Sequence, residues 1–573
     1  MNLFSQFKFP KEESFQRAFS SFSLTEKVVF WILVFLFSVS TFLLLYKVSA
    51  SFSFEVPTEG GKIKEGVVGS ARFINPLLSI SEADKDLTSL IYSGLLKATP
   101  EGNLVPDLVE NYSISEDGLV YDFKLKENLK FHDGSKVTTD DIEFTITKAQ
   151  DPTLKSPRRA SWDGVSIEKI NEREIRLVLK QPYGPFLSNA TLGILPKKLW
   201  KNVSADEFAF SDLNINPVGS GPYKVGSVKK NSSGLPSEYS LKSFRNYAVR
   251  KPYIPTVNIK FYSNENDLID ALRSGEINSA NISSQAAKDL KKNFRVERTL
   301  QPRIFAVFFN QNQANIFAEK ALRQALDISA DKSSIVNEVL KGYGQEISSP
   351  IPNTSIKNGF VGDRTEKAKE ILTKAGWKLS STTGIMEKKT KSATLKLSFT
   401  ISTSEAPELK ATAEKLISDW QKIGAEVTLA IYETGDLNQN IIRPRKYDAL
   451  FFGEIIGRDR DIYPFWHSSQ RNDPGLNVAM YVNNRADKLL EEARAASNIE
   501  IRDAKYEMFL KEIEADVPAV FVYSPQFLYV VPEKIKGIKL GTVTTASERF
   551  TDIENWYMQT TRVWKIFSTN VTN

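Results

Sequence analysis

Two carboxylates stand close together in a polar stretch, and they are the first candidates for chemistry. Asp459 and Asp461 lie in the segment Glu454 to Pro464, which reads EIIGRDRDIYP. Two neighbouring carboxylates can act as an acid/base pair or as ligands of a divalent cation. Arg458 and Arg460 alternate with them, so neutral ion pairs on a solvated turn are an equally good interpretation.

The sequence offers few residues for other kinds of catalytic or metal-binding site. The chain has no cysteine and two histidines, His132 and His467. The missing thiols exclude disulfides, thiolate metal sites, cysteine nucleophiles and a lipid-modified N-terminal cysteine. Neither G-x-S-x-G nor H-E-x-x-H occurs. We interpret His132 as a turn histidine and assign His467 a packing or capping role ahead of a ligand contact. No cofactor or bound metal is expected.

The polar stretch follows a segment that has the pattern of a buried strand. Tyr447 to Gly453, YDALFFG, is a nearly continuous apolar run, as found in sheets that are covered on both faces. Ligands of open α/β sheets bind outside the carboxyl ends of the strands. Physical reasoning alone therefore favours the polar stretch as the binding site.

The residues before that strand predict a strand–helix–strand unit. Apolar residues alternate over 395–399 and again over 427–431. Between them a helix is expected to begin near Pro407, to carry an apolar stripe and to end at Gly424. This order predicts a βαβ unit and therefore a mixed or parallel sheet.

Further elements are predicted on both sides of that unit. Residues 121–125 alternate between apolar and polar side chains, as in a half-buried strand, and Asn171 to Lys180 suggests another strand. A helix is expected with Thr365 as its N-cap and Gly376 as its stop.

Length and composition favour more than one hydrophobic core. The chain has 573 residues, of which 41% are apolar and 25% charged. Folded regions of this length normally divide, so at least two lobes are expected. The net charge of +6 is spread without a dense Lys/Arg run, and we therefore expect no nucleic-acid partner.

One segment predicts a membrane helix. Val28 to Tyr46 carries no charged residue and as a helix would span ~28 Å, about one hydrocarbon thickness. We expect residues 1–27 to be a short cytoplasmic segment, residues 28–46 a transmembrane anchor, and the large remainder extracytoplasmic. The small residues Val48-Ser49-Ala50 leave cleavage after Ala50 as the alternative.

A series of short motifs follows in order along the chain. The most specific is residues 110–134, ENYSISEDGLVYDFKLKENLKFHDG, with a turn, an alternating strand and Phe-His-Asp-Gly. The others are 66–78 (GVVGSARFINPLL), 86–96, 138–151, 217–223 (PVGSGPY), 308–326, 368–377 (AKEILTKAGW), 465–469 (FWHSS) and 483–493. Together they resemble the family 5 extracellular solute-binding proteins, the oligopeptide-, dipeptide- and nickel-binding receptors of ABC importers.

This resemblance implies an α/β fold of two lobes, of the type II periplasmic-binding-protein kind, that enclose the ligand as they shut. Lobe 1 is expected over residues 51–302, with an inserted subdomain at about 98–210. Lobe 2 is expected over residues 303–529, and residues 530–573 would return to lobe 1.

The resemblance also implies ligand-binding residues. Gly453, Glu454 and Ile455 match the stretch whose backbone pairs with an extended peptide in relatives, with Glu454 replacing an aromatic residue that is common there. Such main-chain pairing gives affinity without sequence specificity. The other candidate ligand-binding residues are Asn75 in the Asn-Pro turn, Arg458, Asp459, Asp461 and Trp466.

In peptide-binding relatives an acid near this loop pairs with the α-ammonium of the ligand. Counting from the strand start at Tyr447 places that acid near Gly457. Counting back from Tyr463-Pro464-Phe465 places it at Asp459 or Asp461. Burying an ammonium group is costly unless a carboxylate meets it, so the position of this acid bears on whether a free peptide N-terminus is recognised.

These features predict a membrane-anchored, extracytoplasmic receptor that captures oligopeptides and delivers them to the permease subunits of an ABC importer. It is expected to be a monomer and not an enzyme. One alternative keeps the fold and changes the ligand to a nickel chelate, haem, an oligosaccharide or a signal molecule. Another is a surface hydrolase that uses Asp459 and Asp461, and a third is a sensor whose anchor relays occupancy inward.

Overall fold

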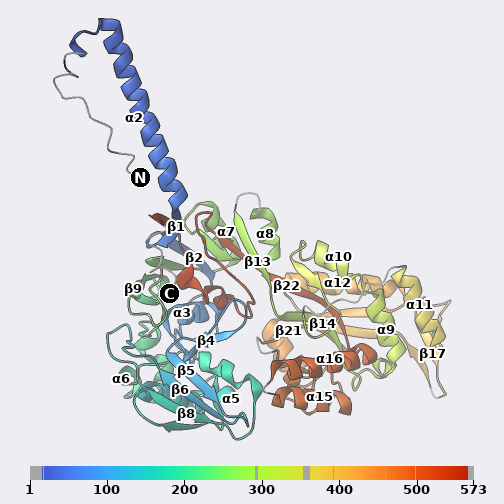
Figure 1. Ribbon diagram of the computed structural model, residues 1–573. Helices are drawn as coiled ribbons and strands as arrows, with labels where there is room; N and C mark the ends of the chain where they lie inside the picture. Colours follow the sequence, from blue (N-terminus) through green and yellow to red (C-terminus); the bar gives the residue numbers. More distant parts are fainter. Residues whose placement is uncertain are drawn as a thin grey trace, which may run out of the picture. The chain divides into compact units, whose positions relative to one another are not determined.

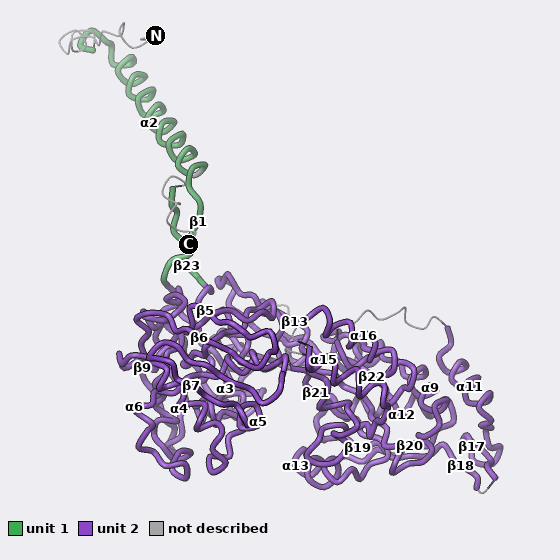
Figure 2. The backbone as a smooth tube through the Cα atoms, turned by 60° about the horizontal axis from the view of Figure 1, so that its bottom comes forward, with its two compact units in different colours: residues 1–59, 557–573 green, residues 60–556 purple. Residues whose placement is uncertain are grey.

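Most of the chain is described by the computed structural model: residue 16 and residues 19–290, 294–352, 362–391, 393–457, 460–496 and 498–564. The chain divides into two compact units (Figure 2). One is Met1–Glu59 with Tyr557–Asn573, and the other is Gly60–Trp556.

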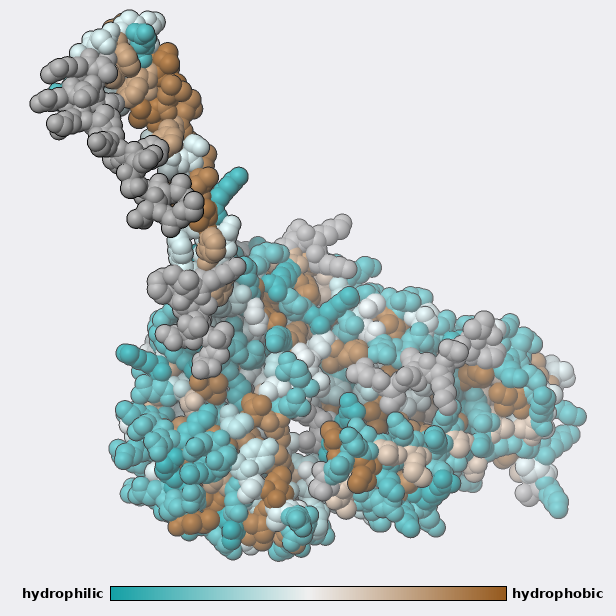
Figure 3. Space-filling model, viewed as in Figure 1, coloured by the Kyte–Doolittle hydropathy of each residue, from teal (hydrophilic) through white to brown (hydrophobic). Residues whose placement is uncertain are grey.

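The smaller unit contains one long apolar helix, α2 (Leu24–Phe52). Ser23 and Glu26 form a capping box at its start, which satisfies backbone N–H groups of the first turn. Within α2, Leu24–Ser49 has a mean hydropathy of 2.7 and is long and apolar enough to cross a membrane. Its apolar side chains are exposed (Figure 3). The helix extends beyond the expected segment, Val28–Tyr46, at both ends.

A two-stranded sheet completes the smaller unit. β1 (Ser53–Thr58) follows α2 directly and pairs antiparallel with β23 (Gln559–Trp564). Strands from opposite ends of the sequence therefore lie side by side.

The larger unit is organised around a long mixed sheet in the order β20-β19-β21-β14-β22-β12-β2-β11-β10-β9. Figure 1 labels β21, β14, β22, β2 and β9 of this sheet. We define lobe 1 by the strands at one end: β2 (Lys62–Val68), β9 (Tyr223–Lys230), β10 (Pro236–Ser243), β11 (Thr256–Tyr262) and β12 (Ser279–Asn281). Both β11 and β12 run parallel to β2. The helices α7 (Glu265–Arg273) and α8 (Ser284–Leu290) bury their apolar residues in one cluster beside these strands.

Lobe 1 also contains a separate four-stranded antiparallel sheet in the order β5-β6-β8-β7. The strands predicted at 121–125 and 171–180 are confirmed as β6 (Val120–Leu125) and β8 (Glu174–Val178), which pair with each other. The other elements of this region are β3 (Leu96–Ala98), β4 (Leu104–Pro106), β5 (Val109–Ile114), β7 (Ser166–Lys169), α3 (Glu82–Ile91), α4 (Thr139–Gln150), α5 (Arg159–Trp162) and α6 (Lys197–Trp200).

We define lobe 2 by the strands at the other end of the long sheet: β14 (Arg303–Phe309), β19 (Ser398–Ser404), β20 (Glu426–Tyr432) and β21 (Ala449–Ile455). β19 and β20 are parallel and joined by α12 (Pro407–Lys422), so the predicted βαβ unit is confirmed. Apolar clusters cover both faces of this sheet. One involves α9 (Lys320–Ser329), α10 (Lys332–Glu338), α11 (Arg364–Lys374) and α12, and the other α15 (Asn484–Ala495) and α16 (Ile499–Asp516).

The helix α11 corrects one detail of the sequence prediction. Its N-cap is Asp363, whose carboxylate accepts the N–H groups of Thr365 and Glu366. The assignment of Thr365 as the cap was wrong by two residues, because Asp is an equally good N-cap and precedes it. The predicted stop is confirmed, since Gly376 follows the C-cap Ala375 with a φ of +89°.

Two chain segments connect the lobes. β13 (Arg295–Leu300) continues through Gln301 and Pro302 into β14. The long strand β22 (Ala519–Val531) pairs with β14 over its first half and with β13 over its second. The remaining described strands are β15 (Gly344–Glu346), β16 (Lys378–Leu379), β17 (Met386–Lys389) and β18 (Thr394–Lys396). The architecture is mixed α/β, as expected.

Candidate functional site

A cleft of about 530 Å³ is lined by residues of both lobes and of their connections. Lobe 1 contributes the end of β2, the first turns of α3 and the start of α8. Lobe 2 contributes Arg303 and Phe305 from β14, Glu408 from α12 and Ile455 from β21. Pro525–Phe527 of β22 and the C-terminal stretch with Thr544–Ala546 and Arg549 complete the lining. Solute sites are typically concave and lie between domains in this way.

An unpaired strand edge borders this cleft. β21 pairs with β14 along its whole length but with β19 only at Ala449 and Leu450. Successive residues of an antiparallel strand point their N–H and C=O groups alternately toward and away from the partner. The N–H of Ile456 donates to Pro302 beside β14, at 2.7 Å. The main-chain groups of Gly453 and Ile455 therefore point to the other side, where no strand among the described residues pairs with them.

The side chains of this strand end differ in what they face. Gly453 is tightly packed, since a Cβ there would lie 2.6 Å from the Phe305 ring. Ile455 is 40% exposed and lines the cleft. Glu454 is 4% exposed, and neither of its carboxylate oxygens has a hydrogen-bond partner in the described part of the chain. Burial raises the pKa of Glu454 well above its ordinary value. The carboxyl group thus lies inside lobe 2 and away from the cleft.

The cleft lining carries charges of both signs. The guanidinium of Arg303 lies 5.9 Å from the centre of the Phe305 ring. Burial lowers the pKa of Arg303, and the charge of Glu82 opposes that shift. Across the described residues, the Arg303 side chain has no hydrogen bond or ion pair. Arg303 is therefore positioned to receive an anionic group.

Four acids line the same cleft: Asp86, which pairs with Arg549, and three glutamates. Glu82 pairs with Lys85 at 3.3 Å, and its other oxygen accepts the Ala546 N–H at 3.2 Å. Glu265 accepts the N–H of Ser283 at 2.6 Å. Glu408 of lobe 2 accepts a hydrogen bond from Ser284 of lobe 1. These glutamates are the available partners for a ligand ammonium group.

A fully buried ionic cluster lies under the cleft. The guanidinium of Arg549, 1% exposed, donates to Glu65 at 2.9 and 3.1 Å and to Asp86 at 2.6 and 2.8 Å. Tyr529 donates its hydroxyl to Glu65 at 2.8 Å. Burial raises the pKa of Asp86 to about 6, although Arg549 opposes that shift. The cluster joins β2, α3, β22 and the C-terminal segment.

The loop after β21 is described only in part. Arg458 and Asp459 lie outside the described residues. Asp461 is positioned by Arg494, whose Nε lies 3.3 Å from its Oδ2, and by the Tyr183 hydroxyl, 3.4 Å from the same oxygen. Burial raises the pKa of Asp461, with Arg494 opposing. Because Tyr183 belongs to lobe 1 and Arg494 to α15, this is a contact between the lobes.

Trp466 and the two histidines are held by packing and hydrogen bonds. Trp466 is fully buried in lobe 2, between Phe308, Phe521 and neighbouring aromatic rings. His467 stacks on Tyr463 with ring centres 4.2 Å apart, and its Nδ1 accepts the Ser469 N–H at the start of a short 3-10 turn. The predicted capping role is confirmed.

His132 and Asn75 both fix turns in lobe 1. His132 contacts the glycine turn through Gly219 N–H at 3.3 Å and Gly221 O at 3.1 Å, and burial lowers its pKa to about 4. The turn role predicted for His132 is confirmed. Asn75 is fully buried, accepts the Leu77 N–H and donates to Asn214. Its side-chain groups are thus engaged within the protein.

Of the predicted ligand-binding residues that the structure describes, Ile455 lines this cleft, and the charged lining was not predicted. Arg303, Glu82, Glu265, Glu408 and Arg549 come from five separate segments. The signal that was available is weak: Arg303 opens an otherwise apolar strand, RIFAVFF. Across the described residues, no group of three or more His, Asp or Glu side chains is arranged to hold a metal ion.

A two-lobed α/β protein with an open strand edge and charges of both signs in its interlobe cleft has the features of a solute-binding protein. The chain belongs to the bacterial extracellular solute-binding proteins of family 5, whose middle-region model matches residues 103–475.

Relatives in this family differ in what they bind. The oligopeptide-binding protein AppA of Bacillus subtilis (strain 168) is 30% identical over 526 residues, 89% of this chain and 94% of AppA. The structure of that protein with a nonapeptide covers 88% of this chain and 100% of its own, with a TM-score of 0.67. NikZ of Campylobacter jejuni, in complex with Ni(L-His), is 27% identical, covers 87% and 99%, and has a TM-score of 0.69. Heme-binding protein A of Haemophilus influenzae (strain ATCC 51907 / DSM 11121 / KW20 / Rd) is 25% identical over 471 residues, 76% of this chain and 81% of that protein.

Proposed function

We propose that this protein is a membrane-anchored extracytoplasmic receptor that binds peptides in the interlobe cleft and hands them to an ABC importer. The observation that carries the proposal is the unpaired edge of β21 at Gly453 and Ile455, beside the cleft. An extended peptide can add to such an edge through main-chain hydrogen bonds, which give affinity for many sequences.

The charged lining suits a zwitterionic ligand. Arg303 is the group available for a peptide carboxylate, because the described residues give it no partner. Guanidinium and carboxylate groups form paired hydrogen bonds that are stronger than neutral ones. Glu82, Glu265 and Glu408 are the candidates for the ammonium end. The similarity to AppA, whose structure holds a nonapeptide, supports a peptide as the ligand.

Lobe closure would couple binding to delivery. We assign the hinge to Gln301–Pro302 and to the middle of β22, which gives lobe 1 as residues 51–302, lobe 2 as 303–529 and a return to lobe 1 over 530–573. A ligand that contacts both lobes stabilises the closed state by its differential affinity. Two side-chain contacts already link the lobes: Ser284 donates to Glu408, and the Tyr183 hydroxyl lies 3.4 Å from Asp461. No chemical step is needed, and the receptor acts as a monomer without enzymatic activity.

The anchor is assigned to α2. Its apolar stretch matches the thickness of a bilayer, and the chain has no cysteine for lipid attachment. If α2 is an anchor, the protein stays in the membrane pellet after alkaline carbonate washing, and its N-terminal peptide is recovered intact by mass spectrometry. A mature protein that begins at Ser51 would show that α2 is a cleaved signal instead.

Calorimetry of the full chain in nanodiscs tests the peptide assignment. A pool of peptides with free termini should bind, and C-terminal amidation should weaken binding ~10-fold or more through loss of a charge-assisted contact. R303Q should lose the same factor for free peptides and nothing further for amidated ones. R273Q, on the exposed end of α7, is the matched control. If no peptide binds and none co-purifies, the peptide assignment fails.

A non-peptide ligand remains the second candidate, because NikZ is similar over 87% of this chain and was solved with Ni(L-His). An amino-acid chelate carries a carboxylate that Arg303 would also receive. Native mass spectrometry of the protein purified from its own cells separates the two, since a chelate and a peptide differ in mass and in metal content.

A further inference from the structure

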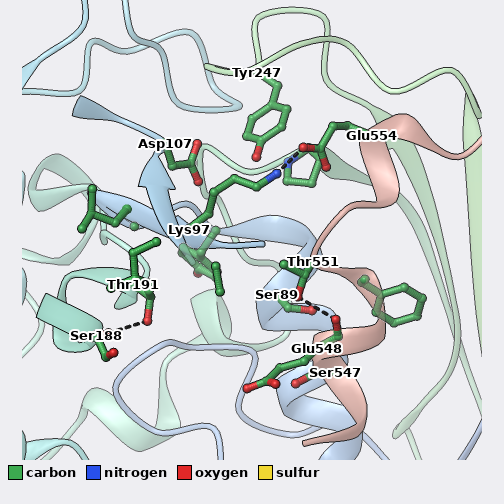
Figure 4. Close-up of a pocket in the computed structure, with 17 residues that line it drawn as sticks. Ser89, Lys97, Asp107, Ser188, Thr191, Tyr247, Ser547, Glu548, Thr551 and Glu554 are labelled. Carbon is green, nitrogen blue, oxygen red and sulfur yellow. Dashed lines mark hydrogen bonds and ion pairs between the residues drawn. The ribbon is translucent and has the colours of Figure 1, made fainter. Parts of the chain in front are cut away.

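A second cavity, of about 310 Å³, lies within lobe 1 and its C-terminal return (Figure 4). It is lined by the end of α3, by β3 and β4, and by the segment from Ser547 to Glu554. None of the lobe 2 strands contributes to its lining. Among the residues that the structure describes, this cavity is therefore lined by lobe 1 and its C-terminal return alone.

One end of the cavity gathers ionisable groups. Figure 4 shows Asp107, Tyr247 and Glu554 placed around the side chain of Lys97. The ammonium group of Lys97 pairs with Glu554, which is 2% exposed on its side chain. Asp107 is 4% exposed, and its Oδ1 has no hydrogen-bond partner in the described part of the chain. Figure 4 shows the Tyr247 side chain beside the Asp107 carboxyl group.

One carboxylate oxygen at this end is left without a hydrogen bond. The charges of Lys97 and Lys126 both act on Asp107, but Lys97 pairs with Glu554, and neither lysine donates to the free Asp107 oxygen in the described part of the chain. The next lysine, Lys126, donates to the backbone oxygen of Ala248 at 3.2 Å. A buried acceptor that is left without a hydrogen bond bears its full desolvation penalty. A bound cation would remove that cost.

The walls of the cavity favour a small organic cation. The aromatic side chains of Tyr92, Tyr247 and Phe550 line it, and aromatic faces attract ammonium groups. A volume of about 310 Å³ holds a short alkyl chain as well as its charged end.

We propose that this cavity is a binding site for a primary alkylammonium group, with Asp107 as its counter-ion and Tyr92, Tyr247 and Phe550 as its walls. The group can be the end of a free alkylamine or of a lysine side chain. The proposal does not depend on what the interlobe cleft binds.

Occupancy should depend on pH. Burial raises the pKa of Asp107 to about 7. The positive charges of Lys97 and Lys126 and the Ser93 hydroxyl oppose this shift, and the negative charge of Glu554 adds to it. Below that pH the carboxyl is protonated and cannot pair with a cation. Above it the carboxylate is ionised and ready to bind. Affinity should therefore fall as the pH drops from 8 to 5, by ~10-fold or more.

The test is calorimetric titration of the full chain with n-butylamine at pH 8 and pH 5. The wild-type protein should bind at pH 8. D107N, which keeps the shape and removes the charge, should weaken binding ~10-fold or more and abolish the pH dependence. D206N changes an exposed aspartate outside the cavity and should behave as wild type. If n-butylamine does not bind, Lys97 already satisfies Asp107 and the proposal is overturned.

A second variant and a second ligand separate the remaining outcomes. A98L places a larger side chain in the cavity and should block n-butylamine even if D107N fails to fold. The peptide Ala-Lys-Ala is compared with its norleucine analogue, which lacks the side-chain amine. If wild type prefers the lysine peptide and D107N loses that preference, the cation belongs to a bound peptide. If n-butylamine binds and neither peptide does, the cation is a free amine. Equal n-butylamine binding by wild type, D107N and A98L would overturn the site, while peptide binding in the cleft could still stand.

Discussion

The two lobes bury carboxylates in opposite ways. In lobe 1, Glu65 and Asp86 are sealed from solvent on either side of Arg549 and receive five hydrogen bonds from it and from Tyr529. In lobe 2, Glu454 is equally inaccessible, but no hydrogen-bond donor among the described residues reaches either of its oxygens. The difference is the presence of a cation.

This contrast shows how context sets the charge of a buried acid. Arg549 offsets the burial of its two acids, and burial still raises the pKa of Asp86 to about 6. Glu454 meets no such offset, so desolvation alone raises its pKa. The lobe 1 cluster therefore joins β2, α3 and the C-terminal segment by an ionic contact, whereas Glu454 is a carboxyl group of raised pKa in an apolar core.

Removing the cation from the lobe 1 cluster should have the largest effect. R549Q leaves two buried carboxylates facing each other and should lower the free energy of unfolding by about 3–5 kcal/mol. Urea unfolding at pH 7 measures this loss. The loss should shrink toward pH 4, because Asp86, whose pKa burial raises to about 6, is then protonated. R273Q, an exposed arginine in lobe 1, is the control. A loss below about 1 kcal/mol would mean that the cluster is not a stabilising link.

Removing the ionisable group of Glu454 from lobe 2 should instead raise the free energy of unfolding. The pKa of Glu454 in the folded protein lies well above its ordinary value of 4.5, so its contribution is fully present below about pH 4.5 and is lost as the pH rises toward the folded pKa. The slope is about 1.4 kcal/mol per pH unit. E454Q cannot ionise and should be more stable than wild type at pH 7, by a margin that grows as the pH rises.

Urea unfolding of E454Q between pH 4 and pH 8 checks this expectation. Wild type and variant should agree near pH 4 and diverge as the pH rises. E405Q, which changes an exposed glutamate of lobe 2, should follow wild type throughout. Parallel curves for wild type and E454Q would show that Glu454 finds a partner in solution.

Local patterns predicted the elements of lobe 2 well. Pro407 stands in the first turn of α12, the apolar stripe faces the sheet, and β19 and β20 flank the helix as a parallel pair. These features depend on residues a few positions apart, which periodicity can detect. The boundaries were less certain: the alternating run at 395–399 is divided between β18 and β19.

Local sequence patterns could not predict where the buried charges lie. Glu65 and Arg549 are 484 residues apart, and only the completed topology brings them together. Glu454 was expected to face a ligand, and the strand's alternation places it instead on the same face as Leu450, inside lobe 2. The run ALFFGEI is apolar toward both of its faces, so it could not indicate which of them borders the cleft.

The contact that Asp461 and Arg494 make with Tyr183 is intermediate between the fully paired Arg549 cluster and the unpaired Glu454. Breaking it should have the smallest effect. Asp461 is partly buried and pairs with Arg494, which also lies over the rings of Tyr183 and Tyr463 at 5.0 and 4.5 Å. Because Tyr183 and Arg494 come from different lobes, R494Q should weaken closure and leave each lobe intact. We expect peptide affinity to fall ~5-fold, which corresponds to about 1 kcal/mol, with little change in the free energy of unfolding.

Calorimetry measures the peptide affinity of R494Q, and small-angle scattering measures how far its lobes close. The radius of gyration with saturating peptide should rise in R494Q if closure is impaired, and K488Q, an exposed change on the same helix, should alter neither quantity. The partly buried Asp461–Arg494 pair stabilises the fold less than the buried lobe 1 cluster does, because water screens its charges. It also destabilises the fold less than an ionised Glu454 would, because Arg494 compensates the charge of Asp461. A contact of that strength can bias closure and still be broken each time a ligand leaves. If R494Q binds peptide as tightly as wild type, the contact stabilises the inserted region of lobe 1 and plays no part in closure.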